Sequence, residues 1–82
     1  MQITIRYFAA ARAAAGTEST VVDVDDDATL GQLETTLAGT NPDLERVLAR
    51  SSYLRDSIAV CDRAVRLGPC KTLDVLPPFA GG

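Results

Sequence analysis

The end of the chain groups residue types that suit acyl chemistry on a main-chain carboxylate. Residues 77–82 read PPFAGG. The two prolines have no N–H for a sheet ladder, so they end a strand and stiffen an extended exit. The two glycines have no β-carbon and adopt whatever φ and ψ a narrow channel requires. We therefore predict that Gly82 carries a reactive carboxylate, that Gly81 gives it clearance, and that Phe79 is an aromatic anchor at the channel mouth.

Activation of this carboxylate needs a second protein. A carboxylate becomes an acyl donor once its oxygen attacks the α-phosphate of ATP, and the activating enzyme must keep water from the resulting adenylate. The chain contains no histidine, which removes the commonest general base and metal ligand. Its two cysteines, Cys61 and Cys70, are too few for a zinc site. We therefore expect no metal, no stably bound cofactor and no catalytic machinery of the chain's own, with ATP consumed by the activating enzyme.

Composition and charge narrow the location and the partners. A length of 82 residues suits one domain. The formal charge of −3 argues against nucleic acid, and it suits either a partner with a basic docking surface or solubility alone. No apolar run approaches a membrane span, and the first residues lack the pattern of a signal peptide. We therefore expect a cytoplasmic protein that binds neither nucleic acid nor membrane, with both cysteines as free thiols.

Periodicity predicts the elements that position the tail. Alternating apolar residues over 3–7 indicate a strand, and the alanine-rich run 8–15 indicates a helix stopped by Gly16. The β-branched stretch 17–24 predicts a second strand that returns beside the first. The acidic run 25–27 is interpreted as a solvated loop, because the further ligands of a calcium loop are missing.

The second half of the chain predicts two helices followed by short strands. Thr29 and Gln32 form the pattern of a capping box for a main helix over 29–39. Asn41 and Pro42 have the types expected at the start of another helix. Ser51-Ser52 breaks that pattern. The remaining expectations are an apolar stripe of Leu30, Leu33 and Leu37, a second stripe of Leu44, Val47 and Leu48, a strand over 57–61, a strand fragment over 65–67 and a last strand around Leu73 and Val75.

Together these elements predict an α+β fold of the β-grasp, ubiquitin-like kind. One main helix packs across a mixed sheet and buries the apolar faces of both. If the first and last strands are neighbours they run parallel, and the intervening chain is long enough for the crossover this requires. We assign residues 1–78 to the β-grasp domain and residues 79–82 to a flexible C-terminal tail that ends in Gly-Gly.

Motifs along nearly the whole chain resemble a known family. The sequence is similar to the small, sulfur-carrying subunit of molybdopterin synthase, the MoaD type of the MoaD/ThiS ubiquitin-like carriers. The most specific parts are the Phe-Ala pair near the start and the Pro-Pro-x-x-Gly-Gly end. The matching positions are Tyr7-Phe8-Ala9, Arg12, Gly16, residues 29–33 (TLGQL) and residues 76–82 (LPPFAGG).

The resemblance implies a function in molybdenum cofactor biosynthesis. An activating enzyme related to ubiquitin E1 adenylates Gly82, and a sulfurtransferase step then converts the adenylate to a thiocarboxylate. The carrier forms a heteromer with the large subunit of molybdopterin synthase and donates sulfur to a cyclic pyranopterin. Whether the carrier itself counts as an enzyme stays open, since it supplies sulfur to a transferase complex.

The resemblance also implies roles for further residues. Phe8, Leu76 and Phe79 match positions of an apolar docking face around the tail, and Arg12 matches a basic position that pairs with a partner's acid. For Phe8 and Leu76, simple core packing is an equal alternative. Several positions depart from the family pattern, and they change the expected turn chemistry before the last strand. These departures are Ala13, Cys61, Cys70 and Lys71.

Two other functions use the same activated tail. One is a sulfur carrier for another pathway, such as thiamin, cysteine or tRNA thiolation. Thiazole carriers typically lack the helix expected at 8–15, which favours the molybdopterin pathway. The other is a ubiquitin-like protein modifier that forms isopeptide bonds through Gly82. The tail does not separate carrier from modifier, because both need an activated carboxylate.

Overall fold

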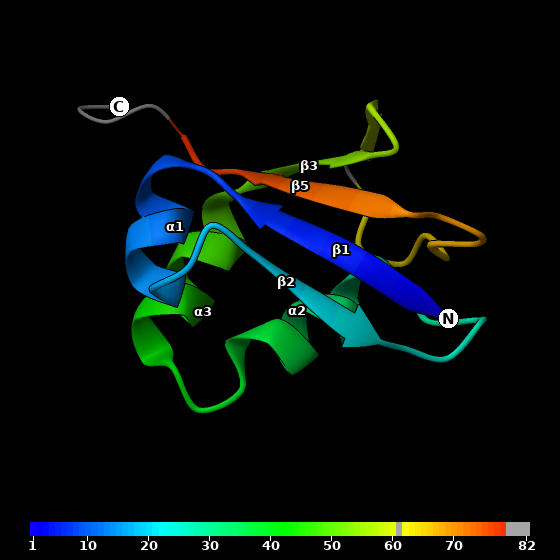
Figure 1. The fold of residues 1–82 in the computed structure, drawn as a ribbon, viewed down its shortest axis with the longest axis horizontal. Coiled ribbons are helices and arrows are strands. Elements are labelled where there is room, and N and C mark those ends of the chain that lie inside the picture. Colours follow the sequence, from blue (N-terminus) through cyan, green and yellow to red (C-terminus); the bar gives the residue numbers. More distant parts are fainter. Residues whose placement is uncertain (61, 79–82) are drawn as a thin grey trace.

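The computed structural model describes residues 1–60 and 62–78. Within them a mixed five-stranded sheet carries helices on one face (Figure 1). This confirms the α+β, β-grasp prediction. The elements in chain order are β1 (Gln2–Tyr7), α1 (Ala9–Ala15), β2 (Ser19–Asp23), α2 (Leu30–Ala38), α3 (Pro42–Arg50), β3 (Ser52–Arg55), β4 (Ile58–Val60) and β5 (Thr72–Leu76).

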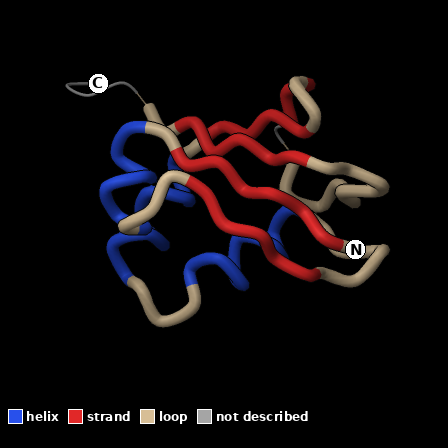
Figure 2. Tube along the Cα trace, in the orientation of Figure 1, coloured by secondary structure: helices blue, strands red, loops and turns tan. Residues whose placement is uncertain are grey.

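The first and last strands are neighbours in the centre of the sheet, so the condition stated for a parallel pair is met. The strand order is β2-β1-β5-β3-β4, and β1 runs parallel to β5 with Tyr7 opposite Val75. The other neighbouring strands pair antiparallel. Figure 2 shows β5 leaving the sheet beside the start of α1. The chain that follows β5 therefore starts from the middle of the sheet rather than from an edge.

Local signals in the sequence fix the helix ends. Gly16 has φ 78°, a left-handed conformation that suits a residue without a β-carbon, and its N–H donates to the Arg12 carbonyl. Thr29 accepts a hydrogen bond from the Gln32 N–H at 3.2 Å, and the Gln32 side chain accepts from the Thr29 N–H at 2.9 Å. Asn41 caps α3 by accepting from the Leu44 N–H at 3.1 Å. These caps confirm the predicted starts of both longer helices.

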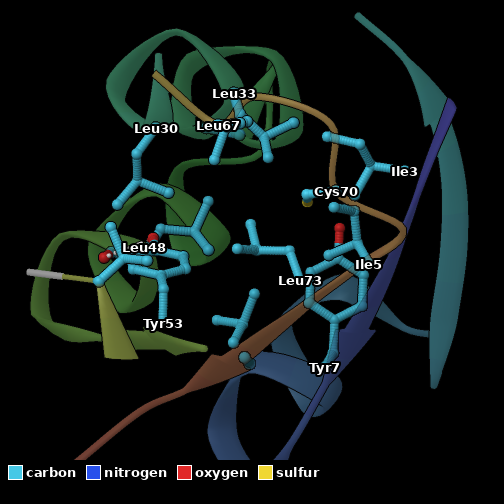
Figure 3. Packing of buried hydrophobic residues seen from close by; sticks show 14 of the residues in the cluster. Ile3, Ile5, Tyr7, Leu30, Leu33, Leu48, Tyr53, Leu67, Cys70 and Leu73 are labelled. Carbon is cyan, nitrogen blue, oxygen red and sulfur yellow. Dashed lines mark hydrogen bonds between the residues drawn. The ribbon is translucent and has the colours of Figure 1, made fainter. Parts of the chain in front are cut away.

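The core lies between the sheet and the helices (Figure 3). Leu33 is 1% exposed, and Leu30 is fully buried beside it on α2. Leu37 and Val47 only pack against the edge of the core, whereas Leu44 and Leu48 of α3 are buried. The buried residues of both predicted stripes therefore face the core, and Leu37 and Val47 lie at the margin of that core.

The region after α3 differs from the prediction. The predicted strand over 57–61 is the second half of a hairpin whose first half, β3, was not expected. Tyr53 of β3 is 1% exposed, because it points toward the core opposite Val75 of β5. The predicted fragment over 65–67 is not a strand but an isolated bridge between Arg66 and Thr29. The chain there hydrogen-bonds to the start of α2 instead of joining the sheet.

No helix in residues 1–60 and 62–78 is long and apolar enough to cross a membrane. In this part of the chain no group of three or more metal-binding side chains gathers either. The acidic run 25–27 is an exposed loop between β2 and α2.

Candidate functional site

The predicted docking residues Phe8 and Leu76 lie at the same end of the sheet. Phe8 is the N-cap residue of α1, and its N–H donates to the Val75 carbonyl at 3.3 Å. This bond holds the start of α1 against β5 one residue before Leu76. Phe8 is 40% exposed and Leu76 is half-buried. Neither residue belongs to the buried core. This removes the core-packing alternative for Phe8, whereas Leu76 lies at the boundary between the core and the surface.

The predicted tail residues fall beyond this point. Gly82, Gly81 and Phe79 lie outside the described residues, as does Cys61. The described chain reaches Pro78, two residues after β5 ends. The described chain therefore ends at the same end of the sheet as Phe8 and Leu76.

An ion pair that sequence reasoning did not identify lies beside Phe8. Arg6 of β1 and Asp74 of β5 are direct neighbours across the central parallel pair. Arg6 Nε donates to Asp74 Oδ1 at 2.6 Å, and Nη2 donates to Oδ2 at 2.7 Å. The Asp74 side chain is only 8% exposed, whereas that of Arg6 is 51% exposed. The hydrogen bonds that Arg6 donates to Asp74 raise the pKa of the Arg6 guanidinium, so the cation is permanent.

The Arg6 guanidinium also contacts the predicted aromatic residue. Its carbon lies 5.7 Å from the centre of the Phe8 ring, a cation–π distance. Asp74, Arg6 and Phe8 therefore form one connected group, which we call the Arg6 cluster. A strand alternates its side chains between two faces, so Arg6 and Asp74 point away from the helices. The cluster lies on the sheet surface that the helices leave open.

Arg12 lies next to the Arg6 cluster but has its own partner. Its Nη2 is 2.7 Å from Glu18 Oε1, and both side chains are largely exposed. The predicted pairing of Arg12 with a partner's acid thus competes with an acid of the same chain. Arg12 does border the same surface hollow as Arg6 and Phe8 of the Arg6 cluster. Its lining residues are Arg6, Tyr7, Phe8, Ala9, Arg12, Glu18 and Ser19.

A second polar network lies on the opposite side of the sheet and has a structural role. Tyr53 Oη lies 2.5 Å from Glu34 Oε2 and 3.1 Å from the Leu48 carbonyl oxygen. Arg63 Nε donates to both Glu34 carboxylate oxygens at 3.1 Å. Burial, followed by the hydrogen bond to Glu34, raises the pKa of the Tyr53 phenol well above its ordinary value. The network ties the loop after β4 to α2 and α3.

Comparison with solved structures places the chain in a family. SAMP1 of Haloferax volcanii is 30% identical, superposes with a TM-score of 0.82, and matches over 100% of both chains. This chain belongs to the MoaD/ThiS-like family of ubiquitin-like proteins. The comparison confirms the family resemblance at this level. No protein-family model matches the chain, and no curated protein matches it.

More distant members show the same fold. Molybdopterin converting factor subunit 1 of Pyrococcus furiosus is 16% identical, with a TM-score of 0.81 over 96% of this chain and 99% of its own. Subunit 1 of the molybdopterin-converting factor of Helicobacter pylori, solved in complex with subunit 2, is 18% identical. Its TM-score is 0.68, with 100% of both chains covered. At these identities the likeness concerns the fold.

Proposed function

We propose that this chain is a carrier whose C-terminal Gly82 is adenylated by an E1-like enzyme and converted to a thiocarboxylate. The observation that carries the proposal is the position of the β5 exit. The chain leaves the centre of the sheet beside the half-exposed Phe8 and the Arg6 cluster. A partner that binds this surface would receive the following residues 79–82 at a fixed distance from its own active site.

Within this proposal, the accepting partner is the large subunit of molybdopterin synthase. The chain donates sulfur there to a cyclic pyranopterin in molybdenum cofactor biosynthesis. The Helicobacter pylori complex of subunits 1 and 2 supports such a heteromer for a protein of this fold. The sulfurtransferase and the activating enzyme would meet the same tail in turn. Phe8, Leu76 and Phe79 then provide apolar contact, and Arg12 exchanges Glu18 for a partner carboxylate.

A second function has an observation in its favour. SAMP1, a small archaeal modifier protein, is 30% identical to this chain, whereas the two converting-factor subunits are 16% and 18% identical. The alternative is that activated Gly82 is transferred to amines of other proteins. The adenylation step is common to both functions, and only the acceptor differs.

One experiment tests the shared step and separates the outcomes. The purified chain is incubated with ATP and an E1-like enzyme that activates proteins of this family, and ATP–pyrophosphate exchange is followed. With a sulfur donor added, a carrier gains about 16 Da, the mass change when sulfur replaces one carboxylate oxygen. A modifier instead appears in covalent conjugates of much larger mass. Absence of exchange with wild-type chain would overturn both functions.

A further inference from the structure

Strand β2 forms one edge of the sheet, and its outer side has no neighbouring strand among residues 1–60 and 62–78 (Figure 1). At one end of its antiparallel ladder with β1, the Tyr7 N–H donates to the Glu18 carbonyl at 2.9 Å. Because backbone groups alternate along such a ladder, every second residue after Glu18 turns its N–H and C=O toward β1. Ser19, Val21 and Asp23 therefore turn their backbone groups outward, where a further strand can bind them.

This edge lacks the features that usually prevent an edge strand from pairing. Lysine, proline, a bulge or a very short strand normally protects such an edge. The sequence of β2 is STVVD, and all five residues pair with β1 in one unbroken register. Val21 at its middle is 59% exposed. At the other edge of the sheet, β4 has only three residues. Strand β2 is therefore the edge better suited to accept another strand.

A second copy of β2 fits this edge in antiparallel orientation. A two-fold axis beside Val21 places each Val21 opposite that of the other copy and each Ser19 opposite Asp23. The outward N–H and C=O groups of these residues then meet their counterparts and form a hydrogen-bonded ladder. The Ser19 carbonyl already accepts from the Thr17 hydroxyl at 3.1 Å, and its second lone pair can accept a ladder bond.

The side chains of β2 suit this pairing on both faces of the sheet. On the open face the two exposed Val21 side chains lie side by side and cover one another. On the helix face the half-buried Thr20 lies opposite the half-buried Val22 of the second copy. Pairs of β-branched residues across neighbouring strands stabilise a sheet. The same register therefore satisfies the backbone and buries apolar surface.

Charge favours the antiparallel orientation over the parallel one. At its Asp23 end, β2 leads into the exposed acidic loop 25–27. At its other end lies Arg12, whose half-exposed guanidinium is 2.7 Å from Glu18 Oε1. Antiparallel pairing places the acidic loop of each copy at the Arg12 end of the other copy, whereas parallel pairing would place the two acidic loops together. The edge is thus electrostatically complementary to a second, reversed copy of itself.

We propose that two copies of this chain associate through β2 into a two-fold symmetric dimer with one continuous sheet. The contact is isologous, so it closes on itself and stops at two copies. Strand β1 lies between the contact and β5, so the exit of β5 stays open in each copy. A contact between two five-residue strands is small, and small interfaces give weak, concentration-dependent association. The dimer does not require an activated tail and is independent of the proposed function.

Sedimentation equilibrium of the full chain between about 10 μM and about 1 mM tests the association. We expect a monomer–dimer equilibrium whose dissociation constant lies within that range. Val21→Lys should raise this constant at least about tenfold, because two like charges then meet beside the two-fold axis, and it should leave Tm nearly unchanged. The matched control is Ile58→Lys, which changes an apolar side chain of 65% exposure on the opposite edge. Its dissociation constant should stay within about twofold of wild type.

Cysteine cross-linking tests the register. Val21→Cys should give a disulfide-linked dimer, because the Cα atoms of directly opposed residues lie about 5.5 Å apart. Ser19→Cys alone should not, because its counterpart is displaced by four residues, about 13 Å along the strand. A mixture of Ser19→Cys and Asp23→Cys chains should cross-link again. Peptide mapping distinguishes these disulfides from those of the native Cys61 and Cys70, which lie in other tryptic peptides.

Three results would overturn the inference. The first is a wild-type chain that remains monomeric at about 1 mM. The second is a dimer that Ile58→Lys dissociates and Val21→Lys does not. The third is a disulfide between two Ser19→Cys chains, which would indicate parallel pairing. These measurements use no activating enzyme, so their outcome is distinct from success or failure of ATP–pyrophosphate exchange.

Discussion

Replacement of Arg6 by alanine should destabilise the domain more than removal of an ordinary surface cation. The Asp74 carboxylate is 8% exposed and receives two hydrogen bonds from Arg6. A hydrogen bond to a charged group contributes about 1.5–3 kcal/mol to stability, and this is lost when the partner is removed and the buried charge is left unpaired. Arg6 is half-exposed, and water can replace part of its contact, so the lower end applies. We expect Arg6→Ala to reduce the free energy of unfolding by about 1–2 kcal/mol.

A double-mutant cycle measures this pair directly. Urea unfolding of Arg6→Ala, Asp74→Ala and the double variant gives the coupling energy, expected at about 1–2 kcal/mol. For a domain of this size, each kcal/mol shifts Tm by about 4–8 °C. The matched control is the pair of Arg12 and Glu18, which has the same chemistry at 2.7 Å but lies in solvent. Its coupling should stay below about 1 kcal/mol. Equal couplings for the two pairs would refute the argument from burial.

Four further predictions follow from burial and from the tail. Leu33→Ala should cost about 2–5 kcal/mol in urea unfolding, because the side chain is 1% exposed in the core. Tyr53 has a raised pKa, so its contribution to stability is present below its unfolded pKa of about 10 and is lost as pH rises toward its folded value. Deletion of Gly82 should abolish ATP–pyrophosphate exchange without changing Tm, since it moves the carboxylate by about 3.5 Å. Phe79→Ala should instead raise KM for the carrier with a smaller effect on kcat.

The first three of these predictions each have a result that would contradict them. A loss below about 1 kcal/mol for Leu33→Ala would mean that α2 does not pack on the sheet as described. Absorbance of ionised Tyr53 phenol in the folded protein near pH 10 would show that Tyr53 is not buried and hydrogen-bonded to Glu34 as described, and Tyr53→Phe serves as the control. Exchange at the wild-type rate after deletion of Gly82 would remove the main support of the carrier function.

Local chemistry explains which elements could be predicted from the sequence. The capping residues Thr29 and Asn41 bond within three positions of themselves, so the starts of α2 and α3 were predictable. Strand β3 was missed because Ser51-Ser52 at its start resembles a break and because Tyr53 becomes an inward residue only through pairing with β5. Its four residues are too short for periodicity alone to identify.

In the candidate site, too, a local motif predicts one residue, whereas the other contacts form only when distant strands pair. Phe8 was identified from a motif, and the structure brings it to the exit of β5. Arg6 and Asp74 are 68 positions apart in sequence, and their contact exists only because two strands pair in one register. A shift of β5 by one residue would turn the Asp74 side chain toward the core while Arg6 stayed on the open face. No pattern within either strand specifies the register, which is set by the packing of the whole sheet.

The parallel pair of β1 and β5 also has a consequence for synthesis. Strand β1 is synthesised before β5, so the centre of the sheet cannot form until β5 has also left the ribosome. Pairings between distant segments are slow to form, and until then β1 has one neighbour and the core lacks Leu73 and Val75. A translation product interrupted before Thr72 therefore lacks the central strand, and we expect it to remain unfolded. Completion of the sheet thus depends on translation reaching the end of β5.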